Sequence, residues 1–175
     1  LSGNLKGIVT NFKIDDFRLD FGKSSFFKGN VAFKGLPELS KTNWNFDLKP
    51  SVITQEDARQ YAGEKYYDEH VKKVGKIDFS GKFNGLYNDF VTTANISSSQ
   101  LGKVRGRVKV KLNKNAALST YYGDIVTNEL QVGQIINRPD LIKDVTFDGI
   151  MDGKGLTIPS ATLKLDGDIR QIYLN

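Results

Sequence analysis

Hydrophobic and polar residues alternate one by one along much of the chain. Between residues 103 and 112, lysine or arginine occupies every second position, and valine, glycine or leucine occupies the positions between them. Successive side chains of a β-strand point to opposite faces of a sheet, so this pattern predicts a strand with one apolar and one polar face. The apolar positions of this segment are Val104, Gly106, Val108, Val110 and Leu112.

The same alternation recurs along the rest of the chain. It is regular in 76–85, 145–153 and 161–170, and weaker in 5–9, 12–21, 31–33, 44–48, 90–96 and 118–126. We therefore expect about ten strands, most of them joined by short turns. In the segment 12–21 the apolar phase changes at Asp15-Asp16, which predicts a β-bulge or a turn at this dipeptide.

One segment departs from the strand pattern. Thr54 is a good N-cap residue, and Asp57 follows it where a capping box usually has glutamate or glutamine. The spacing predicts a short helix from Gln55 to Tyr61, and a continuation near 64–70 is compatible with it. This helical insertion, 51–71, separates a front β section, 1–50, from a back β section, 72–175, that we expect to be continuous with the front. The chain begins at Leu1 without a signal peptide, so we expect a piece of a longer protein.

These patterns indicate a mainly β fold with one short helical insertion. Glycine is frequent, 17 of 175 residues, and it recurs on the apolar faces, where it allows a sheet to coil sharply. We expect a long curled antiparallel sheet whose apolar face forms an open groove. The alternative is a closed β-sandwich in which the same faces form a shared core. The residues expected to line the groove are Ile77, Phe79, Phe83, Val104, Val108, Val110, Leu112, Val145, Phe147, Met151, Leu163 and Leu165.

Residues that could carry catalysis or bind metal are scarce. The chain has no cysteine, which excludes disulfides, thiolate metal sites and a cysteine nucleophile. His70 is the single histidine, and no further ligands stand at metal-binding spacing around it. The carboxylate pairs Asp15-Asp16 and Asp166/Asp168 lie in or beside strands and are interpreted as solvated. Phosphate-binding and dinucleotide-binding motifs are absent. We expect no enzymatic activity, no cofactor and no metal.

The charge is mildly basic, with 25 lysines and arginines against 20 aspartates and glutamates. Its strongest concentration is the polar face of 103–111, which we interpret as a solvated outer face, with side chains that reach acidic residues on neighbouring strands. A surface for lipid headgroups or other anions is one alternative. A nucleic-acid face is another, but aromatic residues do not alternate with the cations there, so we expect no nucleic-acid partner. The chain also lacks an apolar run of membrane-spanning length.

Several glycine-containing stretches carry a family resemblance through their order along the chain. They are 75–90 (GKIDFSGKFNGLYNDF), 92–110 with LGKV at 101–104, 122–133 (YGDIVTNELQVG) with Ile135 and Ile136, 147–155 (FDGIMDGKG), 1–12 (LSGNLKGIVTNF) and 53–57 (ITQED). Together with the helix between them, they resemble the C-terminal region of the TamB family in its Bacteroidota form. TamB is the inner-membrane subunit of the translocation and assembly module and belongs to the AsmA-like group. Glu129 and Leu130 depart from the pattern, because the family has an aromatic and a small polar residue there.

The resemblance implies a function that the residue pattern does not give by itself. It implies a section of a taco-shaped β-groove that spans the periplasm in a protein anchored in the inner membrane. Such a groove carries phospholipid acyl chains between the membranes, meets an outer-membrane barrel protein, and supports outer-membrane biogenesis and protein secretion without catalysis. The alternative function is that of a binding or adhesion domain, built as a closed β-sandwich, in a secreted or surface protein.

Overall fold

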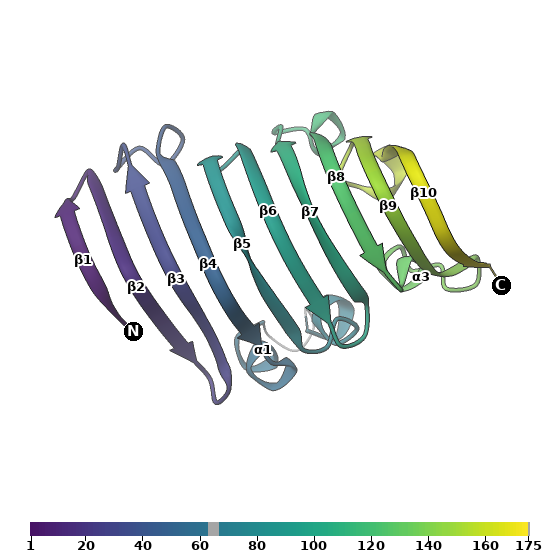
Figure 1. Ribbon diagram of the computed structural model, residues 1–175, viewed down its shortest axis with the longest axis horizontal. Helices are drawn as coiled ribbons and strands as arrows, with labels where there is room; N and C mark the ends of the chain where they lie inside the picture. The colour runs from purple at the N-terminus through teal and green to yellow at the C-terminus, as the bar shows by residue number, and fades with distance from the viewer. Residues whose placement is uncertain (63–66, 175) are drawn as a thin grey trace.

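The computed structural model describes residues 1–62 and 67–174 of the chain, and ten strands in these residues form one sheet. Each strand pairs antiparallel with its neighbours in the chain, so the order in the sheet is the order in the sequence (Figure 1). The strands are β1 Ser2–Ile8, β2 Asn11–Phe21, β3 Ser25–Lys34, β4 Asn43–Ile53, β5 Ile77–Leu86, β6 Asp89–Ser98, β7 Gly102–Lys111, β8 Thr120–Asn128, β9 Ile142–Lys154 and β10 Thr162–Leu174. The expected strands are therefore confirmed, although β8 begins after Leu118 rather than at it.

The helical segments are short and lie at the ends of the strands. Helix α1 spans Gln55–Ala62, which confirms the predicted helix. The continuation expected near 64–70 falls partly on residues 63–66, outside the described part of the chain, and a π-helical turn, η1, covers Tyr67–Val71. Alternation did not predict the remaining helical turns. They are η2 Ala116–Leu118, α3 Val132–Ile135 and η3 Ile158–Ser160.

The predicted bulge at Asp15-Asp16 is confirmed. The pairing of β2 with β3 shifts between Ile14 and Phe17, and Asp16 has a φ of 51°. The backbone N–H of Asp16 donates to the Oδ1 atom of Asn30, 2.9 Å away. This extra residue brings Ile14 and Phe17 onto the same face of the sheet, as the apolar pattern requires.

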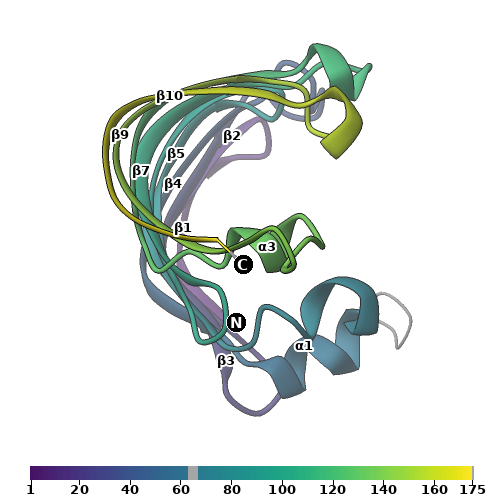
Figure 2. The same ribbon diagram turned by 90° about the vertical axis from the view of Figure 1, so that its right-hand side faces the viewer.

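The sheet is open, and its two edge strands lie at opposite ends of it (Figure 1). It does not roll up across its strands. Instead the strands bend along their own length into an arc, with α1 and α3 at the open side of the arc (Figure 2). A mainly β fold built on one long antiparallel sheet is thus confirmed, and the described residues contain no second sheet that would make a sandwich.

The expected boundaries within the chain are not interruptions of the sheet. Strand β4 runs past residue 50 to Ile53 and pairs with β5, the first strand after the helical insertion.

Little of the apolar surface is enclosed. Phe147 and Tyr67 are the buried hydrophobic residues of the described chain, at 2% and 9% exposure. The apolar side chains of the other strands therefore stay partly in contact with solvent.

Candidate functional site: the concave apolar face

The paired strands place most apolar side chains on one face of the sheet. Directly opposed residues of antiparallel strands share a face, so the register can be followed from strand to strand. One such row crosses the sheet from β2 to β10 and shows the pattern. It consists of Ile14, Val31, Phe46, Phe83, Thr92, Val108, Gly123, Met151 and Leu165.

This face is the concave side of the arc. Tyr61 of α1 packs against Phe21 of β2, with ring centroids 6.0 Å apart, and Phe21 belongs to the apolar face. Helix α1 lies at the open side of the arc in Figure 2. We call this surface the concave apolar face. It consists of the row from Ile14 to Leu165 and of the rows beside it on the same side of the sheet.

Aromatic rings cover the concave apolar face from β2 to β6. Phe33 contacts Phe12 at 5.2 Å and Phe46 at 5.5 Å between ring centroids. Phe83 continues the series, 5.7 Å from Phe46 and 4.4 Å from Phe90. Offset and edge-on ring pairs of this kind stabilise a sheet beyond their buried area. They give the front half of the sheet a continuous aromatic lining.

A glycine-rich row, in which every directly opposed pair contains at least one glycine, runs between the bulky rows. It starts at Gly29, and its members are joined by direct pairing across β3 to β10. At Gly81 and Gly106, a Cβ atom would lie 2.1 and 2.2 Å from a carbonyl oxygen of the next strand. Only glycine allows the backbones to approach so closely where the strands bend. The row comprises Gly29, Leu48, Gly81, Ala94, Gly106, Ile125, Gly149 and Gly167.

The concave apolar face contains a hollow of about 460 Å³ near its centre. Its apolar wall comes from β3, β4, β5 and β6, and includes Phe27, Phe46, Phe79, Phe83 and Ile96. Toward the β10 edge the face stays apolar but becomes more open, and Leu163 is 53% exposed. A hollow with this mainly apolar lining can bind a hydrocarbon chain; its polar border consists of Ser80, Lys82, Thr92 and Thr93.

The residues expected to line a groove come together on this face with one exception. Ile77, Phe79 and Phe83 lie in β5; Val104, Val108 and Val110 in β7; Val145, Phe147 and Met151 in β9; Leu163 and Leu165 in β10. Leu112 follows the last residue of β7, outside the strand. The sequence analysis left out the aromatic residues of β2, β3, β4 and β6. Their alternation was present in the sequence, but bulges hide its phase in β2 and β4.

The outer face carries the basic row of β7, Lys103, Arg105, Arg107, Lys109 and Lys111. The expectation that these side chains reach acidic residues on neighbouring strands was wrong, because none of them forms an ion pair within the described chain. Asp124 lies opposite Arg107, but its carboxylate accepts the backbone N–H of Arg107 at 3.2 Å. The row therefore remains a solvated cationic strip.

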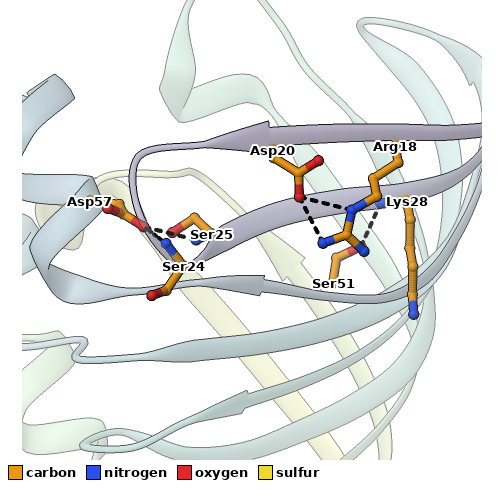
Figure 3. A network of polar contacts seen from close by, with 7 residues as sticks. All are labelled: Arg18, Asp20, Ser24, Ser25, Lys28, Ser51 and Asp57. Carbon is orange, nitrogen blue, oxygen red and sulfur yellow. Dashed lines mark hydrogen bonds and ion pairs between the residues drawn. The ribbon is translucent and has the colours of Figure 1, made fainter. Parts of the chain in front are cut away.

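A buried carboxylate anchors α1 to the sheet at one end of the strands. Asp57 accepts hydrogen bonds from the backbone N–H groups of Lys23, Ser24 and Ser25 at 2.7 to 2.9 Å, and from the Thr54 hydroxyl at 2.9 Å. Figure 3 shows Asp57 together with Ser24 and Ser25. The hydrogen bonds from Lys23 and Ser24 lower the pKa of Asp57 most strongly. The capping motif placed Asp57 at the start of a helix, but it did not reveal that this side chain closes the turn between β2 and β3.

Asp15, Asp166 and Asp168 are other candidate groups that the structure describes. Asp15 pairs with Lys13 at 3.0 Å and Lys6 at 3.4 Å, and its hydrogen bond to Lys13 is the main reason that its pKa is lowered. Asp166 and Asp168 are exposed. The side chain of His70 lies outside the described part of the structure, and no group of three potential metal ligands occurs in the rest.

Comparisons with protein families, with curated proteins and with solved structures find no match. Among the described residues, no helix has the length and apolarity that crossing a membrane would need.

Proposed function

We propose that this chain is a non-enzymatic section of a hydrophobic β-groove that carries phospholipid between the inner and outer membranes. Acyl chains would lie on the concave apolar face. The observation that carries this proposal is the open apolar face itself, which spans the sheet and has no second layer over it in the described chain. Apolar surfaces of this extent usually mark a binding surface, because water contact with them is unfavourable.

The energetics favour hydrocarbon as the bound material. Each methylene group that leaves water for an apolar surface contributes about 0.8 kcal/mol, so a long chain needs only partial burial to stay bound. The lining is mainly aromatic and aliphatic, and the mid-strand hydroxyl of Thr92 already donates to the carbonyl oxygen of Lys82. A site of this type suits the passage of similar chains better than the recognition of one ligand.

The wider setting of the proposal comes from the resemblance to the TamB family. In that setting the full-length protein is anchored in the inner membrane, the present section lies in the periplasm, and an outer-membrane barrel protein is the partner. A role in outer-membrane biogenesis or protein secretion belongs to the same proposal. The departure of Glu129 and Leu130 from the family pattern falls directly after β8, where Glu129 has a φ of 51° and Leu130 forms an isolated bridge with Val145.

The alternative function, a binding or adhesion domain built as a closed sandwich, has less support. A sandwich buries the inner faces of two sheets against each other. Here the same face has large exposed side chains, such as Ile96 at 40% and Ile169 at 54%.

Lipid binding can be tested with the purified chain by native mass spectrometry. We expect adducts with a diacyl phosphatidylethanolamine that survive transfer into the gas phase. The matched control is glycerophosphoethanolamine, which has the same head group without acyl chains and should give no adduct. If saturating phospholipid leaves only the bare protein, the concave apolar face does not serve as a lipid groove.

A further inference from the structure

The outer face of the sheet has a hollow of its own, in the middle of the sheet. Its volume is about 870 Å³, and strands β4 to β8 contribute to its lining. Small-molecule sites in proteins have volumes of this order. Direct pairing shows that its polar side chains point away from the concave apolar face, in two neighbouring rows. One row is Asp47, Lys82, Thr93, Arg107 and Asp124, and the other is Ser80, Asn95, Arg105 and Val126.

The outer hollow exists because long side chains surround short ones. Ser80, Thr93 and Asn95 form a floor on β5 and β6. Arg107 lies directly opposite Thr93 on β7, and Arg105 lies directly opposite Asn95. Within the described residues, none of the three short side chains has a hydrogen-bond partner. The floor therefore offers two hydroxyl groups and one amide group that a ligand can use.

The two arginines of the outer hollow have no acidic partner. Neither forms an ion pair within the described chain. Arg105 lies between Asn95 and Val126, which carry no charge. Asp124 lies opposite Arg107, but its carboxylate accepts the backbone N–H of that residue at 3.2 Å rather than its guanidinium group.

The charge on the β4 side of the outer hollow is more nearly balanced. Lys49 and Lys82 share the carboxylate of Asp47, at 3.5 and 4.0 Å. The whole lining has four cationic side chains against two carboxylates, which leaves a surplus of two positive charges. Because the surplus lies with the unpaired arginines, a ligand with two negative charges would balance it on the β7 side.

A phosphate monoester matches both the charge and the donors. At neutral pH it carries a charge of about −1.5 to −2 and has three strong acceptor oxygens. Guanidinium groups bind such oxygens with two parallel hydrogen bonds, and the hydroxyl groups of Ser80 and Thr93 can donate further ones. A zwitterionic phosphodiester, such as the head group of phosphatidylethanolamine, has one negative charge beside its own ammonium group. It would leave the positive surplus uncompensated.

We propose that the outer hollow binds a free phosphate monoester, with Arg105 and Arg107 as the phosphate-binding residues. Pro50 and Val126 line the same hollow and provide apolar contacts for the carbon body of the ligand. The long side chains around the floor would meet a flat membrane before the floor did, so a free ester fits the hollow better than a membrane head group. The proposal is independent of the groove, because the two sites lie on opposite faces of the sheet.

Isothermal titration calorimetry with glucose 6-phosphate tests the site. We expect saturable binding of one molecule per chain. Glucose is the matched ligand without phosphate and should give no binding heat. Since Arg105 and Arg107 are solvent-exposed, the affinity for glucose 6-phosphate should fall as the salt concentration rises.

Two double variants distinguish a defined site from general attraction to the basic row. In Arg105→Gln/Arg107→Gln we expect at least about tenfold weaker binding of glucose 6-phosphate, because the paired donors and their charge are lost. The matched control is Lys109→Gln/Lys111→Gln, which removes the same charge from the same face of β7 outside the outer hollow. Its affinity should stay within about twofold of the unmodified chain. All four positions are exposed, and circular dichroism verifies the fold of both variants.

Three results would overturn the proposal. The first is the absence of binding heat with glucose 6-phosphate at low salt. The second is an equal loss of affinity in the two double variants, which would mean that the basic row attracts anions without a defined site. The third is binding to phosphatidylcholine vesicles that contain phosphatidic acid, sensitive to Arg105→Gln/Arg107→Gln, when the free ester does not bind. That result would assign the outer hollow to a lipid head group.

Discussion

At the scale of single residues, Asp57 connects parts of the chain that are far apart in sequence. Its carboxylate is 2% exposed and binds the turn after β2, which precedes it by more than thirty residues. The Thr54 N–H donates to the Ser25 hydroxyl at 2.8 Å, so the start of α1 is joined to the same hairpin a second time. Helix α1 is short, and these contacts rather than its own propensity hold it against the sheet.

Replacing Asp57 should destabilise this end of the sheet. In an Asp57→Asn variant the amide keeps one acceptor oxygen but loses the charge and part of the bonding to the backbone N–H groups. We expect the thermal midpoint to fall by several degrees, measured by circular dichroism. The control is Asp20→Asn. Asp20 is exposed and pairs with Arg18 at 2.7 Å, and surface pairs contribute little to stability. Equal midpoints for the two variants would contradict the anchoring role of Asp57.

The contribution of Asp57 should also depend on pH with a definite sign. The pKa of Asp57 is lowered in the folded chain, whereas an unfolded chain has the usual aspartate value near 3.9. The stabilisation is therefore complete above about pH 4 and is lost as the pH falls through the lowered pKa. We expect the difference in thermal midpoint between the unmodified chain and Asp57→Asn to shrink below pH 4. A difference that stays constant down to strong acid would show that the charge of Asp57 is not the cause.

At the scale of secondary-structure elements, the glycine-rich row links eight strands, from β3 to β10. Each glycine in the row lies directly opposite another member of the row on the adjacent strand. Close backbone approach is therefore repeated at the same height in successive strands. We infer that this repeated close approach is what lets neighbouring strands follow the same arc.

A methyl group in this row should be costly where glycine now stands. Gly106→Ala would place Cβ 2.2 Å from the Asp124 carbonyl oxygen, so the backbones would have to separate. We expect a loss of about 1–3 kcal/mol in the free energy of unfolding, measured by urea titration. Ala94 lies directly opposite Gly106, and Ala94→Gly serves as the control with an expected loss of roughly 0.5–1 kcal/mol. A neutral Gly106→Ala would show that the strands do not need this close approach.

At the scale of the whole molecule, stability and function place different demands on the apolar side chains. Most globular domains bury their apolar faces between two layers. This chain keeps one sheet open, and pairs between neighbouring strands replace part of the missing core. The concave apolar face can then remain open to hydrocarbon while the sheet stays folded.

A charge on the concave apolar face should therefore affect binding more than folding. Val108 lies on this face between Thr92 and Gly123, and it is partly exposed. In Val108→Asp we expect a loss of about 1 kcal/mol in stability and at least about tenfold weaker lipid binding, because a carboxylate is unfavourable beside hydrocarbon. The control is Arg107→Asp, the next residue, on the outer face. It should change neither quantity appreciably.

Two measurements separate the possible outcomes for this pair. Circular dichroism reports the fold, and native mass spectrometry with phosphatidylethanolamine reports binding. An unfolded Val108→Asp together with an intact Arg107→Asp would mean that Val108 belongs to a closed core. Intact lipid binding in both variants would contradict the groove in another way, because it would place the lipid elsewhere on the molecule.

Local patterns were enough to predict the strands, the apolar face of the regular ones, the helix that begins at Gln55 and the bulge at Asp15-Asp16. These features are local. Alternation, capping residues and a change of phase can be read within about ten neighbouring residues, because the period of a strand and the start of a helix depend on adjacent positions.

How the strands combine became clear from the three-dimensional structure. Alternation is the same in a sandwich and in an open sheet, since both need one apolar side for each strand. The alignment of Gly81, Ala94 and Gly106 in one row and the reach of Asp57 to the β2–β3 turn depend on registers between strands. Those registers are decided by cross-strand packing and by backbone hydrogen bonds, which a single segment of sequence does not contain.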